Sequence, residues 1–233
     1  MVVVMTTSTP LEGKSPVRQT NPRRRHSVKL MVGAIAAIAL GGFAVVAVLD
    51  YSTQSRTDSF VGVESIVVHL DAGGITLQGS NGAEVVVNTT LHSSAIGSPD
   101  LDQRLTNGVL TITGSCSGLS MNCGVDQVIA VPPGVAVAVQ LNAGEITANG
   151  LDVPQFQSQT GSGRVTASFV RPPDLVDIRI DTGELLATVP DTGYRVDART
   201  STGSTDIELH EQPDAQQLIR VRIDTGNIKL ASY

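Results

Sequence analysis

The two cysteines carry the most reactive side chains in this 233-residue sequence. Cys116 and Cys123 are seven positions apart in a stretch rich in glycine and serine. Two cysteines with no histidine near them cannot supply the four ligands of a structural zinc site. In an exported domain, the natural expectation is a disulfide that closes this loop. Free thiols are the alternative.

Cys116 also lies where a nucleophile elbow would place its reactive residue. Residues 114–118 read Gly-Ser-Cys-Ser-Gly, which resembles the Gly-x-Ser-x-Gly motif with cysteine at the centre. Such an elbow needs a strand before it and a helix after it. The residues that follow Gly118 have the composition of a loop, so the disulfide is the stronger interpretation and we predict no catalytic residue.

The histidines and acidic residues show no metal-binding pattern. His69, His92 and His210 are isolated, and no His-x-His or His-Glu-x-x-His motif occurs. Several glycines are preceded by an acidic residue, but the Gly-Gly-x-Gly-x-Asp repeat of calcium-binding solenoids is missing, so turn capping explains these acids better. We therefore expect no cofactor, no metal and no enzymatic activity.

Three arginines recur four residues before a glycine, and a fourth lies nearby. If the glycine turns stack, these like charges meet across neighbouring strands and repel one another. Asp177 and Asp197 lie on the same predicted face and can offset two of them. One hypothesis is contact with an anion, such as a glycopolymer or a lipid headgroup; the alternative is a solvated face with salt bridges. The four residues are Arg179, Arg199, Arg220 and Arg222.

These arginines belong to a repeat with a period near 20 residues. From Gly144 onward the repeated glycines are 19, 20, 20 and 23 residues apart. Apolar residues lie three, five and seven positions before most of these glycines, with polar residues between them, which is the period of a half-buried strand. A short polar residue and a glycine then form a turn. A strand, a corner and a second strand at this period predict one rung of a β-solenoid.

The first 60 residues have a different composition from the rest. Residues 1–29 are basic and rich in serine, threonine and proline, which predicts a disordered tail. Residues 30–49 contain no charge and are long enough to cross a membrane as one helix. The apolar segment is too long for a cleaved signal peptide and ends without a good cleavage site, so we predict an uncleaved signal anchor. Residues 50–60 read as a polar linker.

The charge is divided unevenly along the chain. Residues 1–49 hold six basic residues and one acidic residue, whereas residues 50–233 hold ten basic and 21 acidic residues. The positive-inside rule places the basic tail in the cytoplasm and the acidic domain outside, as a single-pass protein of the cell membrane. An acidic domain argues against nucleic acid as a partner, because nucleic acid requires a basic surface.

The segment Val131-Pro132-Pro133-Gly134-Val135, followed by a strand, Asn-Ala-Gly and the later Thr/Ser-Gly turns, resembles the bacterial "putative adhesin" family of short β-repeats. The resemblance covers roughly residues 60–233. It implies an all-β domain with a single-stranded, right-handed β-helix or β-solenoid-like fold, no enzyme and no defined ligand. Within residues 61–233, we expect irregular β structure up to residue 130 and regular rungs from 131 onward.

Two functions are compatible with this organisation. The leading interpretation is a non-catalytic, membrane-anchored extracytoplasmic protein that binds or scaffolds at the cell envelope, in contact with an envelope polymer or a protein. The alternative is a single-pass sensor of envelope stress that relays a signal to its cytoplasmic tail. Deletion of residues 1–22 distinguishes them, because only the sensor needs the tail.

The last residues form the predicted end of the solenoid. The final strand reaches Tyr233 with no polar cap after it, and a bare strand edge templates further pairing. We therefore expect this edge to be covered by a second copy or by a partner protein. The edge residues are Lys229, Leu230, Ala231, Ser232 and Tyr233.

Overall fold

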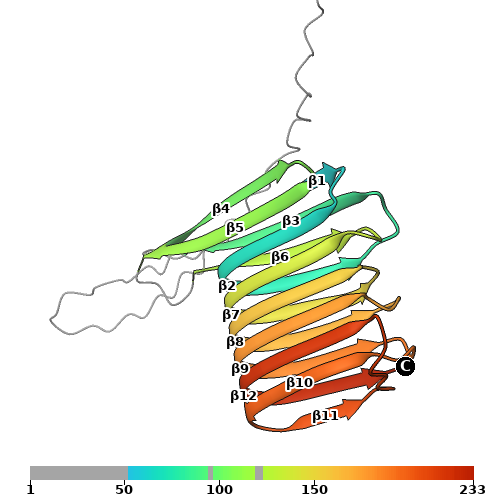
Figure 1. The fold of residues 1–233 in the computed structure, drawn as a ribbon. Coiled ribbons are helices and arrows are strands. Elements are labelled where there is room, and N and C mark those ends of the chain that lie inside the picture. The colour runs from blue at the N-terminus through green and yellow to red at the C-terminus, as the bar shows by residue number, and fades with distance from the viewer. Residues whose placement is uncertain (1–51, 94–96, 119–122) are drawn as a thin grey trace, which may run out of the picture.

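The computed structural model describes residues 52–93, 97–118 and 123–233, and this part of the chain is all β (Figure 1). The predicted tail over residues 1–29 and the predicted membrane helix over residues 30–49 lie outside the described residues. Within the described residues, no helix is long and apolar enough to span a membrane.

The described residues form twelve strands. In chain order they are β1 (Ser52–Val61), β2 (Ser65–Gly79), β3 (Glu84–Ser93), β4 (Gly97–Thr106), β5 (Val109–Gly118), β6 (Gly124–Val131), β7 (Ala136–Leu151), β8 (Gln155–Phe169), β9 (Leu175–Val189), β10 (Arg195–Thr202), β11 (Thr205–Glu208) and β12 (Leu218–Ser232).

All twelve strands belong to one mixed sheet. Its main order is β1-β3-β6-β2-β7-β8-β9-β12-β10, while β4 pairs with β5, β5 with β2, and β11 with β12. The strands from β2 through β7, β8, β9 and β12 to β10 are parallel. The pairs β1–β3, β3–β6 and β4–β5 are antiparallel. The antiparallel pairs thus all lie among β1 to β6, which end at Val131, and the strands from β7 onward pair only in parallel.

Each long strand folds over near its middle, so that its two halves face each other. Phe156 and Phe169 lie at the two ends of β8, yet their ring centroids are 5.6 Å apart in an edge-to-face contact. A straight strand of that length would separate them by about 40 Å. The two halves of one strand can also pair with different neighbours: the first half of β2 pairs with β5 and its second half with β6.

The core lies between the two halves and follows the predicted alternation. In β7 the buried residues of the first half are Val137, Val139 and Leu141, and those of the second half begin with Ile146 and Ala148. Their polar neighbours point outward. Because the inward residues are mostly valine, isoleucine and leucine, both halves pack on one hydrophobic cluster.

The fold point is a stack of glycines in register. Gly144, Gly163, Gly183 and Gly226 pair in sequence across neighbouring strands. Gly183 has φ +154°, and a Cβ added to it would lie 1.7 Å from the carbonyl oxygen of Gly163. No side chain can be accommodated at that distance, so the corner requires glycine both for its φ and for the close approach of the next strand.

Two segments form strands where the sequence predicted none. Residues 52–61, which overlap the linker expected over residues 50–60, form β1 and pair with β3 over their whole length. Residues 97–106, for which the sequence predicted irregular β structure and no regular strand, lie in β4 and pair with β5. Both are edge strands with few buried side chains, so they lack a strong apolar alternation and are held mainly by backbone hydrogen bonds to a better-patterned neighbour.

The prediction that the last strand is a bare edge was wrong. β12 lies inside the sheet, between β9 on one side and β10 and β11 on the other (Figure 1). Its first half carries Ile219, Val221 and Ile223, all buried, whereas β10 offers only Val196 and Ala198 at the matching positions. A neighbour on both sides buries more apolar surface for β12 than it would for β10, which explains why the less apolar β10 lies at the edge.

We predict that Gly183→Ala destabilises the protein far more than Gly134→Ala. Gly134 has φ +81° but nothing within 4 Å of an added Cβ, so its substitution tests φ alone and should cost about 1–2 kcal/mol. Gly183→Ala adds a clash with the neighbouring backbone and should cost at least about 3 kcal/mol. Denaturant unfolding of both variants measures the difference. Equal losses would show that the stacked backbone is not the constraint.

Candidate functional site

The four arginines expected from the sequence lie together on the outer face of the sheet. Arg179 on β9 is directly opposite Arg222 on β12, and Arg222 is directly opposite Arg199 on β10. Their spatial order therefore differs from their order in the chain, because β12 lies between β9 and β10. Arg220 lies two residues before Arg222, where it is opposite Asp177 on β9 and Asp197 on β10.

Each of the two aspartates on this face contacts two arginines. Asp177 lies 3.2 Å from Nη1 of Arg220 and 3.5 Å from Nε of Arg179. Asp197 lies 3.0 Å from Nε of Arg199 and accepts a short hydrogen bond from Nη2 of Arg222. We call these six residues the arginine face. Its four arginines and two aspartates give a formal charge of +2.

The hydrogen bond between Asp197 and Arg222 on the arginine face favours the charged forms of both side chains. The hydrogen bond from Arg222 is the main reason that the pKa of Asp197 lies below its ordinary value. The same hydrogen bond raises the pKa of Arg222. The outer two arginines are more open to solvent: the side chains of Arg179 and Arg199 are 60% and 74% exposed, against 41% for Arg220.

A shallow depression of about 220 Å³ adjoins the arginine face on the same side of the sheet. Its lining includes Asp177 and Arg179 at one end and His69 at the other, with glutamines between them. Nδ1 of His69 lies 3.1 Å from Oε1 of Gln140. Amide groups both donate and accept hydrogen bonds, so this row can bind hydroxyl-rich ligands without adding charge. The glutamines are Gln140, Gln157 and Gln159.

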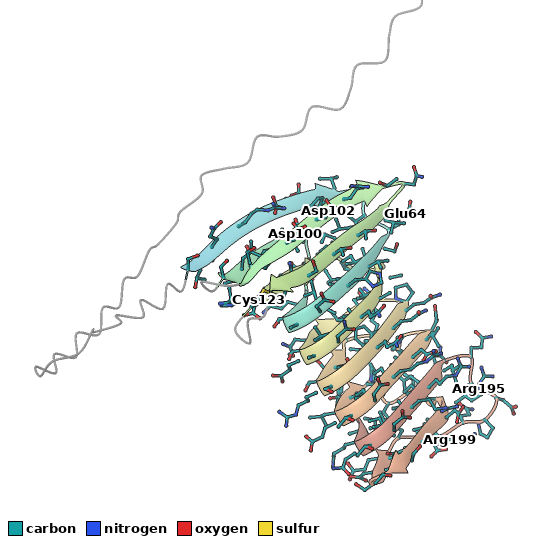
Figure 2. All side chains as sticks on the ribbon, turned by 90° about the vertical axis from the view of Figure 1, so that its left-hand side faces the viewer. Glu64, Asp100, Asp102, Cys123, Arg195 and Arg199 are labelled. Carbon is teal, nitrogen blue, oxygen red and sulfur yellow. A yellow bond between two sulfur atoms is a disulfide. The ribbon has the colours of Figure 1, made fainter. Side chains whose placement is uncertain are left out.

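The arginine face differs from its acidic surroundings. Four of the ten basic residues after residue 49 belong to it. Outside this face, an arginine such as Arg164 forms a salt bridge with a separate acidic residue, in this case Glu184. Figure 2 places Arg199 at the end of the molecule opposite to Asp100 and Asp102. The surface therefore has a local basic region on a domain whose overall charge is negative.

The cysteines form the disulfide that the sequence suggested. Cys116 near the end of β5 is bonded to Cys123, just before β6, with their Cα atoms 5.8 Å apart. Cys116 lies within a strand and not in a turn after one, and its sulfur is bonded in the disulfide, so it offers no nucleophilic thiol. Among the described residues, no group of three or more His, Cys, Asp or Glu side chains is placed to hold a metal ion.

Sequence reasoning missed a polar contact beside this disulfide. Nε2 of His92 on β3 lies 2.8 Å from Oδ2 of Asp126 on β6, and Oδ1 of Asp126 accepts a hydrogen bond from the backbone N–H of Gly74. The contact ties two antiparallel strands to the corner of β2. His92 and Asp126 are 34 residues apart and follow no motif, so only the pairing of β3 with β6 could have revealed them.

The residues predicted as an edge interface are covered by this chain itself. Lys229 lies 3.1 Å from Asp206 and 3.7 Å from Glu208 on β11, and the hydrogen bond to Asp206 is the main reason that the pKa of Lys229 is raised. Leu230 is buried, and the hydroxyl of Tyr233 donates to the carbonyl oxygen of Phe169. These residues hold the end of the sheet together and leave β10 and β11 as its outer strands.

Comparison with a solved structure establishes a shared fold. A "putative cell adhesion protein" from Clostridium sporogenes matches with a TM-score of 0.55 at 14% identity, covering 77% of this chain and 100% of that chain. A "putative adhesin" from Bacteroides fragilis matches with a TM-score of 0.22 at 10% identity, covering 76% and 96% of the two chains. One from Parabacteroides merdae matches with a TM-score of 0.26 at 10% identity, covering 77% and 93%. No family model matches the sequence, and no curated protein matches it.

We predict that Asp197→Asn flattens the loss of stability in acid. A carboxyl whose pKa is lowered by folding contributes stability above its ordinary value, 3.8, and that contribution is lost as the pH falls through the lower folded value. Thermal unfolding should therefore become less pH-dependent below about pH 4 in this variant. Asp214→Asn, at an exposed position, is the matched control. If the unfolding temperature depends on pH in the same way below about pH 4 in all three proteins, the role of Asp197 is contradicted.

Proposed function

We propose that this chain is a non-catalytic, membrane-anchored, adhesin-like protein whose extracytoplasmic domain binds an anionic glycopolymer of the cell envelope. The observation that carries the proposal is the arginine face: four arginines at neighbouring register positions, with only two aspartates to balance them. The shared fold with a "putative cell adhesion protein" is consistent with a binding role. In this proposal the stacked parallel strands act as a rigid solenoid that presents the face.

The anchor is inferred from the uncharged segment over residues 30–49. It is long enough to span the hydrocarbon core, and the six basic residues before it favour a cytoplasmic N-terminus. The described domain begins directly after it, with β1 at Ser52. In this proposal the sheet lies on the outer side of the membrane, where envelope polymers are found.

The geometry of the arginine face suits a polymer with repeated anionic groups. Neighbouring strands in a sheet are about 4.8 Å apart, so Arg179, Arg222 and Arg199 form a row of guanidinium groups at that spacing. A guanidinium group can bind a carboxylate or phosphate through two parallel hydrogen bonds. The adjoining depression supplies amide groups for sugar hydroxyls, which is why we favour a glycopolymer over a simple anion.

The net negative charge of the domain opposes the approach of an anionic polymer to the arginine face. Residues 50–233 hold 21 acidic and ten basic residues, so the long-range field repels a polyanion. Binding must therefore come from contacts at the face itself. The aspartates also hold Arg220 and Arg222 in place, which leaves the more exposed Arg179 and Arg199 as the main contacts to a ligand.

We predict that Arg179→Gln combined with Arg199→Gln weakens binding of a sulfated dextran about tenfold. Each exposed charge contact contributes up to about 1 kcal/mol, and two of them correspond to roughly that ratio. The double variant keeps the contacts of Asp177 with Arg220 and of Asp197 with Arg222. Calorimetry on the full-length chain in micelles of an uncharged detergent, with neutral dextran as the reference polymer, measures the change.

The matched control is Arg104→Gln combined with Arg171→Gln, which removes the same charge at two exposed positions outside the arginine face. We expect this control to bind like the unmodified protein. Equal weakening in both double variants would attribute binding to net charge and contradict the proposal. Binding of vesicles with anionic lipid, without binding of the sulfated polymer, would contradict it in favour of a lipid headgroup.

A further inference from the structure

β10 is an open edge of the sheet. It pairs with β12 on one side, and among the described residues no strand pairs with its other side along Val196–Thr202. The residue before β10 is covered, because the N–H of Tyr194 donates to the carbonyl of His210, and the N–H of Gln212 donates to the carbonyl of Tyr194. An uncovered strand edge can pair with another strand.

The hydrogen bonds of β10 show which of its backbone groups face outward. The N–H of Arg195 donates to the carbonyl of Gln217, toward β12. Successive residues of a strand direct their N–H and C=O groups to opposite sides. The groups of Val196, Ala198 and Thr200 therefore point away from β12, where nothing in the described chain satisfies them.

The side chains of β10 discriminate between the ways in which two copies could pair. In an antiparallel pair centred on Ala198, the outward backbone groups of the two copies meet, and Asp197 of each copy lies opposite Arg199 of the other. Centring the pair on Asp197 would instead oppose Asp197 to itself and Arg195 to Arg199. Centring it on Arg199 would oppose two arginines. Opposite charges stabilise cross-strand pairs and like charges destabilise them.

We propose that two copies of this chain associate through β10 in the antiparallel register centred on Ala198. Asp197 and Arg199 occupy non-hydrogen-bonded positions of that pair, where facing Cα atoms are closest, about 4.5 Å apart. β11 carries Asp206 and Glu208, and its acidic side chains disfavour pairing with a second β11. The contact is therefore confined to β10.

The functional consequence of this association depends on the proposed function. The two-fold axis of such a pair is perpendicular to the sheet, so both arginine faces lie on the same side. The row formed by Arg179, Arg222 and Arg199 then continues into the same row of the second copy in reverse order. One polymer chain could contact both, and the membrane anchor would raise the effective concentration of a contact that is small on its own.

Site-directed disulfides test the register. In the proposed pair, position 195 lies opposite position 201, so the full-length double variant Arg195→Cys, Ser201→Cys in lipid vesicles should form a disulfide-linked dimer on mild oxidation. The two positions are six residues apart in one extended strand, too far for a bond within one copy. Arg195→Cys alone and Ser201→Cys alone are the matched controls. Dimer yields in either single variant equal to the double variant would overturn the register.

Charge reversal tests the proposed ion pairs. Adding Arg199→Glu to the double cysteine variant sets a carboxylate at position 199 against Asp197 of the second copy, and we expect the dimer yield to fall about fivefold or more. Adding Arg171→Glu makes the same charge change outside the proposed contact and should leave the yield unchanged. An unaffected yield with Arg199→Glu, or cross-linking only to another protein, would overturn the proposal.

The two proposals can fail separately. Cross-linking needs no polymer, so it reports the β10 contact even if the arginine face binds nothing. Arg179→Gln lies outside the proposed contact and should weaken binding of the sulfated dextran without changing the dimer yield. A loss of dimer in Arg179→Gln would contradict the assignment of the contact to β10.

Discussion

The close stacking of backbone at the glycine corner is the constraint on which the structure depends. A Cβ at Gly144, Gly163 or Gly183 would lie within 2 Å of the carbonyl oxygen of the preceding corner glycine. This approach lets each long strand fold over without losing its register with the next. With the register set, the apolar residues on either side of the corner necessarily face inward, and the core between the two halves follows.

The same constraint assembles the candidate site. Positions four residues before each corner glycine are aligned across neighbouring strands, so arginines that are 43 and 23 residues apart in the chain become direct neighbours. Such neighbours repel unless anions lie between them. Asp177 and Asp197 supply part of that charge, and the remaining positive charge is what makes the face a candidate for an anionic ligand. The fold thus brings the residues together, and the electrostatics determine what they can bind.

Much of the fold was predictable where the sequence alternates strongly. The alternation in β2, β7, β9 and β12 marks strands because burial of β-branched residues on one face is a local property of the sequence. β1 and β4 escaped prediction because edge strands are held by backbone bonds to a neighbour and leave little trace in their own side chains. His92 and Asp126 escaped because their contact depends on the pairing of β3 with β6.

The sequence alone determined the all-β class, the glycine corners, the disulfide partners and the set of arginines that share a face, since each depends on local period or on composition. Only the tertiary structure decided the order of the strands. β12 lies between β9 and β10 because its isoleucines and valine bury more apolar surface with a neighbour on both sides than β10 would. That placement covered the C-terminal strand, reordered the arginines and left β10 at the edge, because strand order is a competition among all strands for burial and no single segment encodes it.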